Sequence, residues 1–227
     1  MSDTPNDKHA SQSHSFDMNA IDGRLRAMYT NDKDKEQSYD EWANKYDNDL
    51  INELAYVAHI DAARIFSELD VDREARILDV ACGTGLVGEE LSKLGFSHID
   101  GTDFSNGMIA VAQERGIYGT LFRHDFTEAL PTPHQYDAVI CVGLFSFSIP
   151  RIEHMHHVVN AVKPGGQCLI TVNGAAWREL DLAPSVEAES EKHGFVIERI
   201  ETSGYIRQEG IDARVLIIRM PSELTNV

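Results

Sequence analysis

Three glycines and an aspartate in residues 76–88 have the types and spacing that suit a ligand-binding loop. Asp79 lies in an apolar, β-branched run, and Gly83, Gly85 and Gly88 follow it. Glycine permits positive φ angles and lets a ligand approach the backbone closely. A helix that begins after such a loop presents free N–H groups and its positive end to the ligand. The segment is therefore predicted to form a strand, a tight turn and a helix around a polar ligand.

The glycine spacing by itself fits two kinds of cofactor. Gly83, Gly85 and Gly88 spell G-x-G-x-x-G, and Asp103 follows about twenty residues later, as in dinucleotide-binding proteins. Asp79 argues against a dinucleotide, because its carboxylate would repel a pyrophosphate and attract an ammonium group. S-adenosylmethionine (SAM) carries an α-amino group, a carboxylate and a ribose, and so suits both the acid and the loop. An NAD(P)-dependent oxidoreductase stays a less favoured alternative.

A family resemblance supports the same choice. The run Leu78-Asp79-Val80-Ala81-Cys82-Gly83-Thr84-Gly85 resembles motif I of the class I SAM-dependent methyltransferases, and the resemblance extends roughly over residues 39–219. With the lead-in Tyr39-Asp40-x-Trp42-Ala43-x-x-Tyr46-Asp47, the chain resembles the methyltransferase-like proteins of the Williams–Beuren region type.

This resemblance implies SAM as the cofactor and SN2 transfer of its sulfonium methyl to a small-molecule acceptor. It leaves the acceptor atom open among O, N, S and C. A non-catalytic SAM-binding or interaction module is the main alternative, because function depends on the site and not on the fold.

Further cofactor contacts are expected where the next strands end. Asp103 can accept both ribose hydroxyls there, whereas Asp100 stands earlier in the same strand and is expected to face outward. Asp125 is placed to accept a hydrogen bond from the adenine amino group, and Phe126 to pack on the ring. Met108 is either a core residue or, as in similar enzymes, a contact to the adenine face.

Three aromatic residues recur at i, i+3 and i+7 before the glycine loop, on one face of a predicted helix. They either pack the helix on the core or form a lid over the cofactor, where a tyrosine beside a sulfonium is favourable. The complete predicted cofactor site is Tyr39, Trp42, Tyr46, Asp79, Ala81, Cys82, Gly83, Thr84, Gly85, Asp103, Phe104, Ser105, Met108, His124, Asp125, Phe126, Val142 and Gly143.

No catalytic residue can be assigned from the pattern. His154, His157 and Tyr205 are candidates, the histidines as a general base. A metal site is not expected, because His154 and His156 face different sides of the predicted helix over residues 152–162 and no carboxylate near them completes a ligand set.

Alternating strands and helices must position these residues. The pattern predicts a Rossmann-like α/β fold: a seven-stranded, mostly parallel sheet with an antiparallel last strand, helices on both faces and an N-terminal helical lid. Residues 50–69 are predicted to be one amphipathic helix, and residues 162–166 a turn before the fifth strand. Residues 1–33 are expected to be a tail, mobile or partly helical, and residues 34–227 the methyltransferase domain.

Composition limits the partners. The 227 residues carry a net charge of −17, with a pI near 4.9, which argues against a nucleic-acid binder and against docking on an anionic membrane. Cys82, Cys141 and Cys168 show no metal-ligand spacing and are predicted to be buried free thiols. No apolar leader or long apolar run is visible, so a cytoplasmic protein is expected.

Overall fold

Seven strands form a single sheet in the computed structural model, which describes residues 35–131 and 133–223. The strand order is β3-β2-β1-β4-β5-β7-β6, parallel from β3 to β5 and antiparallel where β7 pairs with β5 and β6. This confirms the predicted fold class. The strands are β1 (Arg76–Val80), β2 (His98–Asp103), β3 (Leu121–Arg123), β4 (Tyr136–Phe145), β5 (Val162–Asn173), β6 (Val196–Ile206) and β7 (Ile211–Arg219).

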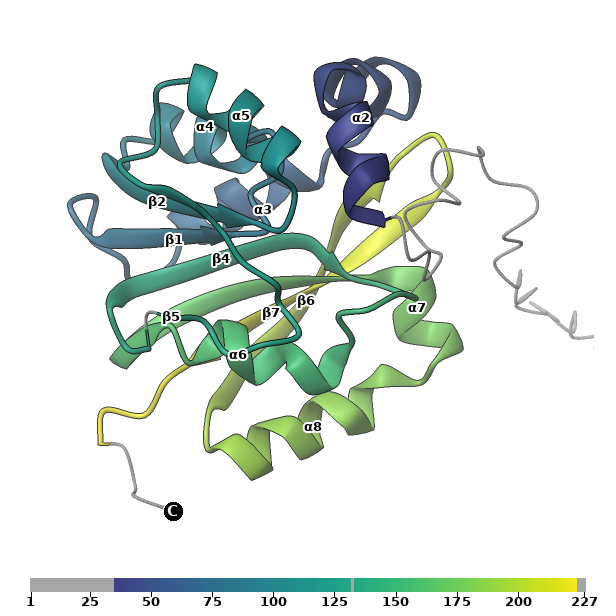
Figure 1. Cartoon of the computed structure of the whole chain (residues 1–227). Coiled ribbons are helices and arrows are strands. Elements are labelled where there is room, and N and C mark those ends of the chain that lie inside the picture. The colour runs from purple at the N-terminus through teal and green to yellow at the C-terminus, as the bar shows by residue number, and fades with distance from the viewer. Residues whose placement is uncertain (1–34, 132, 224–227) are drawn as a thin grey trace, which may run out of the picture.

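Helices cover both faces of the sheet, with α3, α4 and α5 on one face and α6 and α8 on the other (Figure 1). Helix α2 lies beside α5, at the end of the sheet where the parallel strands finish (Figure 1). The helices are α2 (Lys35–Asn48), α3 (Ala58–Ser67), α4 (Leu86–Lys93), α5 (Asn106–Glu114), α6 (Met155–Val159), α7 (Gly174–Glu179) and α8 (Leu182–His193), with short turns η1 (Asp49–Glu53) and η2 (Ile152–His154).

Each face of the sheet has its own apolar core. Successive strand side chains point to opposite faces, so Ile77 of β1 packs in the core under α3 and α4, and Leu78 in the core under α6 and α8. All three cysteines are buried free thiols, as predicted. No helix of residues 35–131 and 133–223 is long and apolar enough to cross a membrane.

The prediction of one helix over residues 50–69 is wrong. The chain forms the π-helical turn η1, leaves helical geometry at Ala55 (φ +50°), and starts α3 at Ala58. Tyr56 instead forms a β-bridge with Ile206 at the end of β6, and the Val57 N–H donates to the carbonyl of Tyr205. Pairing with a distant strand therefore outweighs the local helical periodicity.

Two other predicted boundaries also differ. Residues 162–166 belong to β5, where the pairing with β4 shifts register after Tyr136 and Gly165 adopts φ +80°. The predicted turn is thus an irregularity inside a longer strand. The helix predicted over residues 152–162 is the turn η2 followed by the short helix α6. The predicted N-terminal tail lies outside the described residues.

Candidate functional site

A cavity of about 350 Å³ opens where the parallel strands end. Gly83 from the loop after β1, Asp103 at the end of β2, Asp125 after β3 and Gly143 near the end of β4 all line it. Ligands of open α/β sheets bind at this edge, in the crevice outside the carboxyl ends of the strands. The cavity is therefore the candidate ligand site.

Most of the predicted cofactor residues line this cavity, and a smaller set lies behind its wall. The lining residues among those predicted are Tyr39, Tyr46, Ala81, Gly83, Asp103, Phe104, Met108, Asp125, Phe126, Val142 and Gly143, together with the catalytic candidate Tyr205. The predicted residues outside the lining are Trp42, Asp79, Cys82, Thr84, Gly85, Ser105 and His124, and the catalytic candidates His154 and His157.

The loop after β1 has the left-handed backbone that the glycines suggested. Ala81, Gly83 and Gly85 have φ angles of +57°, +54° and +93°. A Cβ added to Gly83 would meet no atom within 4 Å, so this glycine leaves open space at the wall of the cavity. The Gly83 N–H donates to Oδ2 of Asp103 at 2.9 Å, which joins the loop to the end of β2.

Asp103 is a buried acceptor at the cavity wall. Its side chain accepts backbone N–H groups from Gly83 on Oδ2 and from Ser105 on Oδ1, at 2.9 and 3.0 Å. A carboxylate has about four acceptor positions, so it retains capacity for a diol such as ribose. Burial raises the pKa of Asp103 to about 6, against the lowering effect of these N–H groups. Asp100 instead binds Arg76 and the Tyr136 hydroxyl and does not line the cavity.

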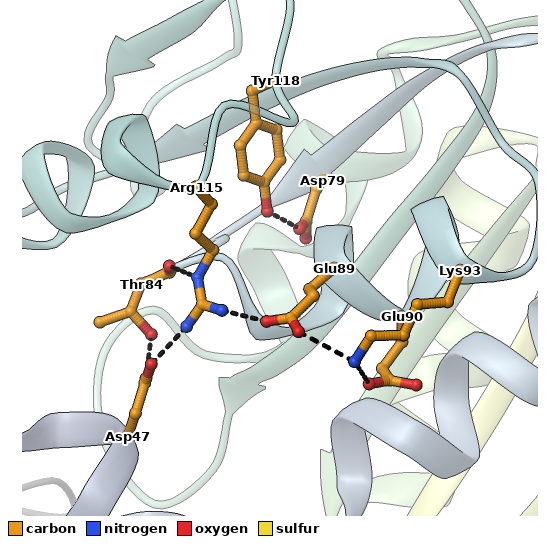
Figure 2. A network of polar contacts seen from close by, with 8 residues as sticks. All are labelled: Asp47, Asp79, Thr84, Glu89, Glu90, Lys93, Arg115 and Tyr118. Atoms are coloured by element: carbon orange, nitrogen blue, oxygen red, sulfur yellow. Dashed lines mark hydrogen bonds and ion pairs between the residues drawn. The ribbon is translucent and has the colours of Figure 1, made fainter.

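Asp79 lies beneath the loop and not in the cavity wall. Its side chain is inaccessible to solvent and accepts a hydrogen bond of 2.7 Å from the Tyr118 hydroxyl (Figure 2). Burial raises its pKa to about 7. A Cβ at Gly88 would collide with the same hydroxyl. The third glycine of the fingerprint thus makes room for Tyr118, whose hydroxyl binds Asp79.

Helix α2 covers the cavity with its two tyrosines. Tyr39 packs edge-on against Phe104, with ring centroids 5.3 Å apart, and Tyr46 lines the cavity beside it. Trp42, on the same helix, packs on the core instead, and its Nε1–H donates to Oδ2 of Asp49 at 2.7 Å. Tyr46 also packs on the core beside Trp42, so the aromatic stripe both lines the ligand site and packs the helix.

The two aspartates of the same lead-in attach α2 to the core. Asp40 accepts hydrogen bonds from the Ser105 hydroxyl and from the Gly107 N–H, at the start of α5. Asp47 accepts from the Thr84 hydroxyl and pairs with Arg115 (Figure 2). Ser105 and Thr84 thus hold the covering helix and do not line the cavity.

The candidate bases differ in position. Tyr205 is buried in the cavity wall, and burial raises the pKa of its hydroxyl, which stays protonated at neutral pH. His154 receives a hydrogen bond from the Arg151 N–H on Nδ1 and, like His157, stands away from the cavity.

Sequence reasoning missed several polar lining residues: Lys35, Glu36, Tyr56, Arg123, Thr127, Ser146 and Ser148. Lys35 and Glu36 lie at the start of α2, where Lys35 donates to the Ser148 hydroxyl at 2.9 Å and Glu36 pairs with Arg123 at 2.7 Å. Tyr56 reaches the cavity only because the chain breaks between η1 and α3. The lead-in motif was the available signal for the first two, since both stand directly before it.

Comparisons with known proteins agree with this geometry. A family model for methyltransferase domains matches residues 77–166. Human methyltransferase-like protein 27 is 35% identical over 173 residues, which cover 73% of this chain and 65% of the human protein. The ubiquinone biosynthesis O-methyltransferase of Aeromonas salmonicida is 30% identical over 106 residues, 43% of each chain.

Solved structures show the same fold. A SAM-dependent methyltransferase from Mesorhizobium loti superposes with a TM-score of 0.54 at 18% identity, covering 71% of this chain and 97% of the other. The present chain spans 65% or less of the length of the two curated relatives named above. The family model identifies residues 77–166 as a methyltransferase domain, and the seven-stranded topology is the fold of the SAM-dependent methyltransferase from Mesorhizobium loti, which together indicate SAM as the cofactor.

Proposed function

We propose that this protein transfers the methyl group of SAM to a small-molecule acceptor held in the cavity under α2. The observation that carries the proposal is that α2 places Tyr39 and Tyr46 across from the strand ends. SAM and the acceptor must therefore share a covered space of about 350 Å³, which is at the small end of the range of small-molecule sites.

The strand ends form the cofactor half of the cavity. Open space at Gly83 suits the methionine part of SAM, and the free acceptor positions of Asp103 suit its ribose hydroxyls. Met108 and Phe126 offer apolar surface to the adenine ring, and Asp125 an acceptor for its amino group. SAM supplies the electrophilic methyl group when it is bound.

The other half of the cavity supports orientation and water exclusion more than proton transfer. Tyr39, Tyr46, Tyr56 and Tyr205 line it, and no histidine stands among the described lining residues. Burial raises the pKa of Tyr39, Tyr46 and Tyr205, so these hydroxyls are neutral hydrogen-bond donors near pH 7. Such a site suits an acceptor that is already nucleophilic near neutral pH, and positioning supplies the rate enhancement.

Binding of S-adenosylhomocysteine tests the cofactor half. Gly83→Val should abolish binding, because the side chain fills the open space and strains a left-handed residue. Gly116→Val is the matched control: Gly116 has φ +65° and equally open surroundings, but does not line the cavity. Near-wild-type affinity in Gly83→Val, measured by titration calorimetry, would remove the loop from the cofactor site.

The ribose assignment has its own matched pair. Asp103→Asn should weaken the binding of S-adenosylhomocysteine by about tenfold or more, because a charge-assisted hydrogen-bond acceptor is lost. Asp100→Asn should leave affinity unchanged, because Asp100 faces Arg76 and not the cavity. The reverse result would overturn the assignment.

Methyl labelling tests the acceptor class. The full chain is incubated with cell extract and methyl-labelled SAM, and label is measured in the low-molecular-weight, protein and nucleic-acid fractions. Label above the level of Asp103→Asn in the low-molecular-weight fraction supports the proposal. Label only in a macromolecular fraction contradicts a small-molecule acceptor, and label in no fraction supports a non-catalytic SAM-binding module.

A further inference from the structure

Two histidines and a glutamate meet on the sheet face opposite α3, α4 and α5. His156 comes from α6, and Glu189 and His193 come from α8, one turn apart (Figure 1). Oε2 of Glu189 lies 3.3 Å from Nδ1 of His156 and 3.3 Å from Nε2 of His193. None of the three residues lines the cavity, so the cluster is separate from the proposed methyl-transfer site.

The three facing atoms are close but not hydrogen-bonded. Nδ1 of His156, Oε2 of Glu189 and Nε2 of His193 are each buried without a hydrogen-bond partner among the described residues. A buried polar atom without a hydrogen-bond partner destabilises the folded state. Three such atoms that converge on one point therefore call for a shared partner.

Two of the three distances within the cluster match those between ligands of a tetrahedral ion. With metal–ligand bonds of about 2.0–2.1 Å, two ligand atoms on a tetrahedron stand about 3.3 Å apart. Both nitrogen–oxygen distances match this value, and all three atoms lie within 4.8 Å of one another. We propose that His156, Glu189 and His193 bind a zinc-class divalent metal ion through these three atoms, with water in the fourth position.

The ligand types select the class of metal. Two imidazoles and one carboxylate suit Zn²⁺ and its transition-metal neighbours, whereas Mg²⁺ and Ca²⁺ prefer oxygen ligands. Lys192 lies 3.7 Å from Oε1 of Glu189, the oxygen that does not face the histidines. The carboxylate is thus positioned to bind through Oε2 alone.

Metal binding requires one rearrangement. The His156 and His193 rings are stacked, with centroids 3.9 Å apart and planes 3° from parallel. The rings must therefore tilt until the lone pairs of Nδ1 of His156 and Nε2 of His193 point at the same ion. The side chains are 18% and 22% exposed, so they border solvent, which gives the rings room to tilt and the ion a way in.

The cluster also explains why the sequence pattern predicted no metal site. The carboxylate of the cluster does not stand close to His156 in the sequence but comes from a helix more than thirty residues later. Glu189 and His193 are spaced i, i+4, which places both on one face of α8. A bound ion would link α6 to α8 across the outer layer of the fold.

Zinc titration of the chelator-treated full chain tests the site. Wild type is expected to bind one equivalent of Zn²⁺ in addition to any weaker surface sites, with a rise in melting temperature that a chelator reverses. His156→Ala, His193→Ala and Glu189→Gln should each weaken this step at least about tenfold and remove the thermal shift. Mg²⁺ should produce neither effect.

His157→Ala is the matched control. Its ring lies 4.0 Å from that of His156, yet it contributes no atom to the cluster, so zinc binding should be unchanged. Circular dichroism without metal confirms that each variant is folded, and Glu189→Gln preserves the shape of the side chain. Zinc binding that survives in all three cluster variants, or falls equally in His157→Ala, overturns the proposal. Absence of a zinc-binding step in wild type also overturns it.

Discussion

Helices α2 and α3 are neighbours in the chain but are held to the sheet by different forces. Helix α3 buries one whole face of mostly apolar residues, Ala58, His59, Ala62, Ala63, Ile65 and Phe66. In α2 only Ala43 is buried, while Trp42 and Tyr46 pack on the core as partly buried side chains. Most of the remaining attachment is polar, through Glu36, Asp40 and Asp47.

The difference suggests that α3 is a permanent part of the fold, whereas α2 is a cover over the cavity. Apolar burial of a whole face is lost only when the core opens. Polar contacts near the surface contribute little each, and they can be exchanged for water. We therefore predict that helix α2 opens at lower free-energy cost than α3 and so admits ligand, while α3 stays in place.

The largest effect is expected in the α3 interface. Phe66→Ala should lower the free energy of unfolding by about 3–5 kcal/mol, because a large side chain with no solvent exposure leaves a cavity. Ile60→Ala, at a position 47% exposed on the same helix, should change it by less than about 0.5 kcal/mol. Urea denaturation of both variants measures the contrast, and similar losses would contradict the idea that α3 is held by its buried face.

The core contains a buried carboxyl group, that of Asp79, which should make the stability of the protein depend on pH. The pKa of Asp79 is raised by burial from 3.8 to about 7, so between pH 4 and 7 the folded state binds a proton that the unfolded state lacks. Stability from this group is therefore complete at low pH and falls as pH rises through about 7. Between pH 4 and pH 8, the free energy of unfolding of Asp79→Asn should rise relative to that of the wild type by up to about 4 kcal/mol. A difference independent of pH, in denaturation at both pH values, contradicts the prediction.

A smaller effect is expected where α2 is fastened most strongly. Arg115 joins Asp47 of α2, Glu89 of α4 and the Thr84 carbonyl, with its side chain 18% exposed (Figure 2). Arg115→Ala should lower the free energy of unfolding by roughly 1–3 kcal/mol. It should also speed hydrogen exchange in α2 more than in α3. Lys93→Ala, at an exposed pairing partner of Glu89, should do neither. Equal acceleration in both helices would mean that α2 is part of the rigid core.

The smallest effect concerns the outer end of α2. Glu36 and Arg123 are 40% and 45% exposed, so Glu36→Gln should cost only about 0.2–1 kcal/mol. The Glu36→Gln variant is most informative when hydrogen exchange of residues 37–50 is measured with and without S-adenosylhomocysteine. Protection should rise with ligand in wild type and start lower in the variant. Equal protection with and without ligand would show that α2 is permanently docked and that the site is open by default.

Local sequence determined the sheet and the central loop. Short apolar runs that end in glycine or aspartate specify strand ends, and the period of two along β2 places Asp103 at the cavity and Asp100 away from it. The left-handed turn at Gly83 follows from residue type alone. These features could be predicted because each depends on residues adjacent in the chain.

Tertiary structure decided the features whose partners are distant in sequence. Tyr56 enters the cavity because β6 pairs with it and interrupts a helical pattern. Gly88 accommodates Tyr118, which lies in the segment between α5 and β3. Glu189 reaches His156 because α6 and α8 pack together. Propensity and periodicity act over a few residues, whereas these contacts are selected by burial and hydrogen bonding among elements that meet only in the folded chain.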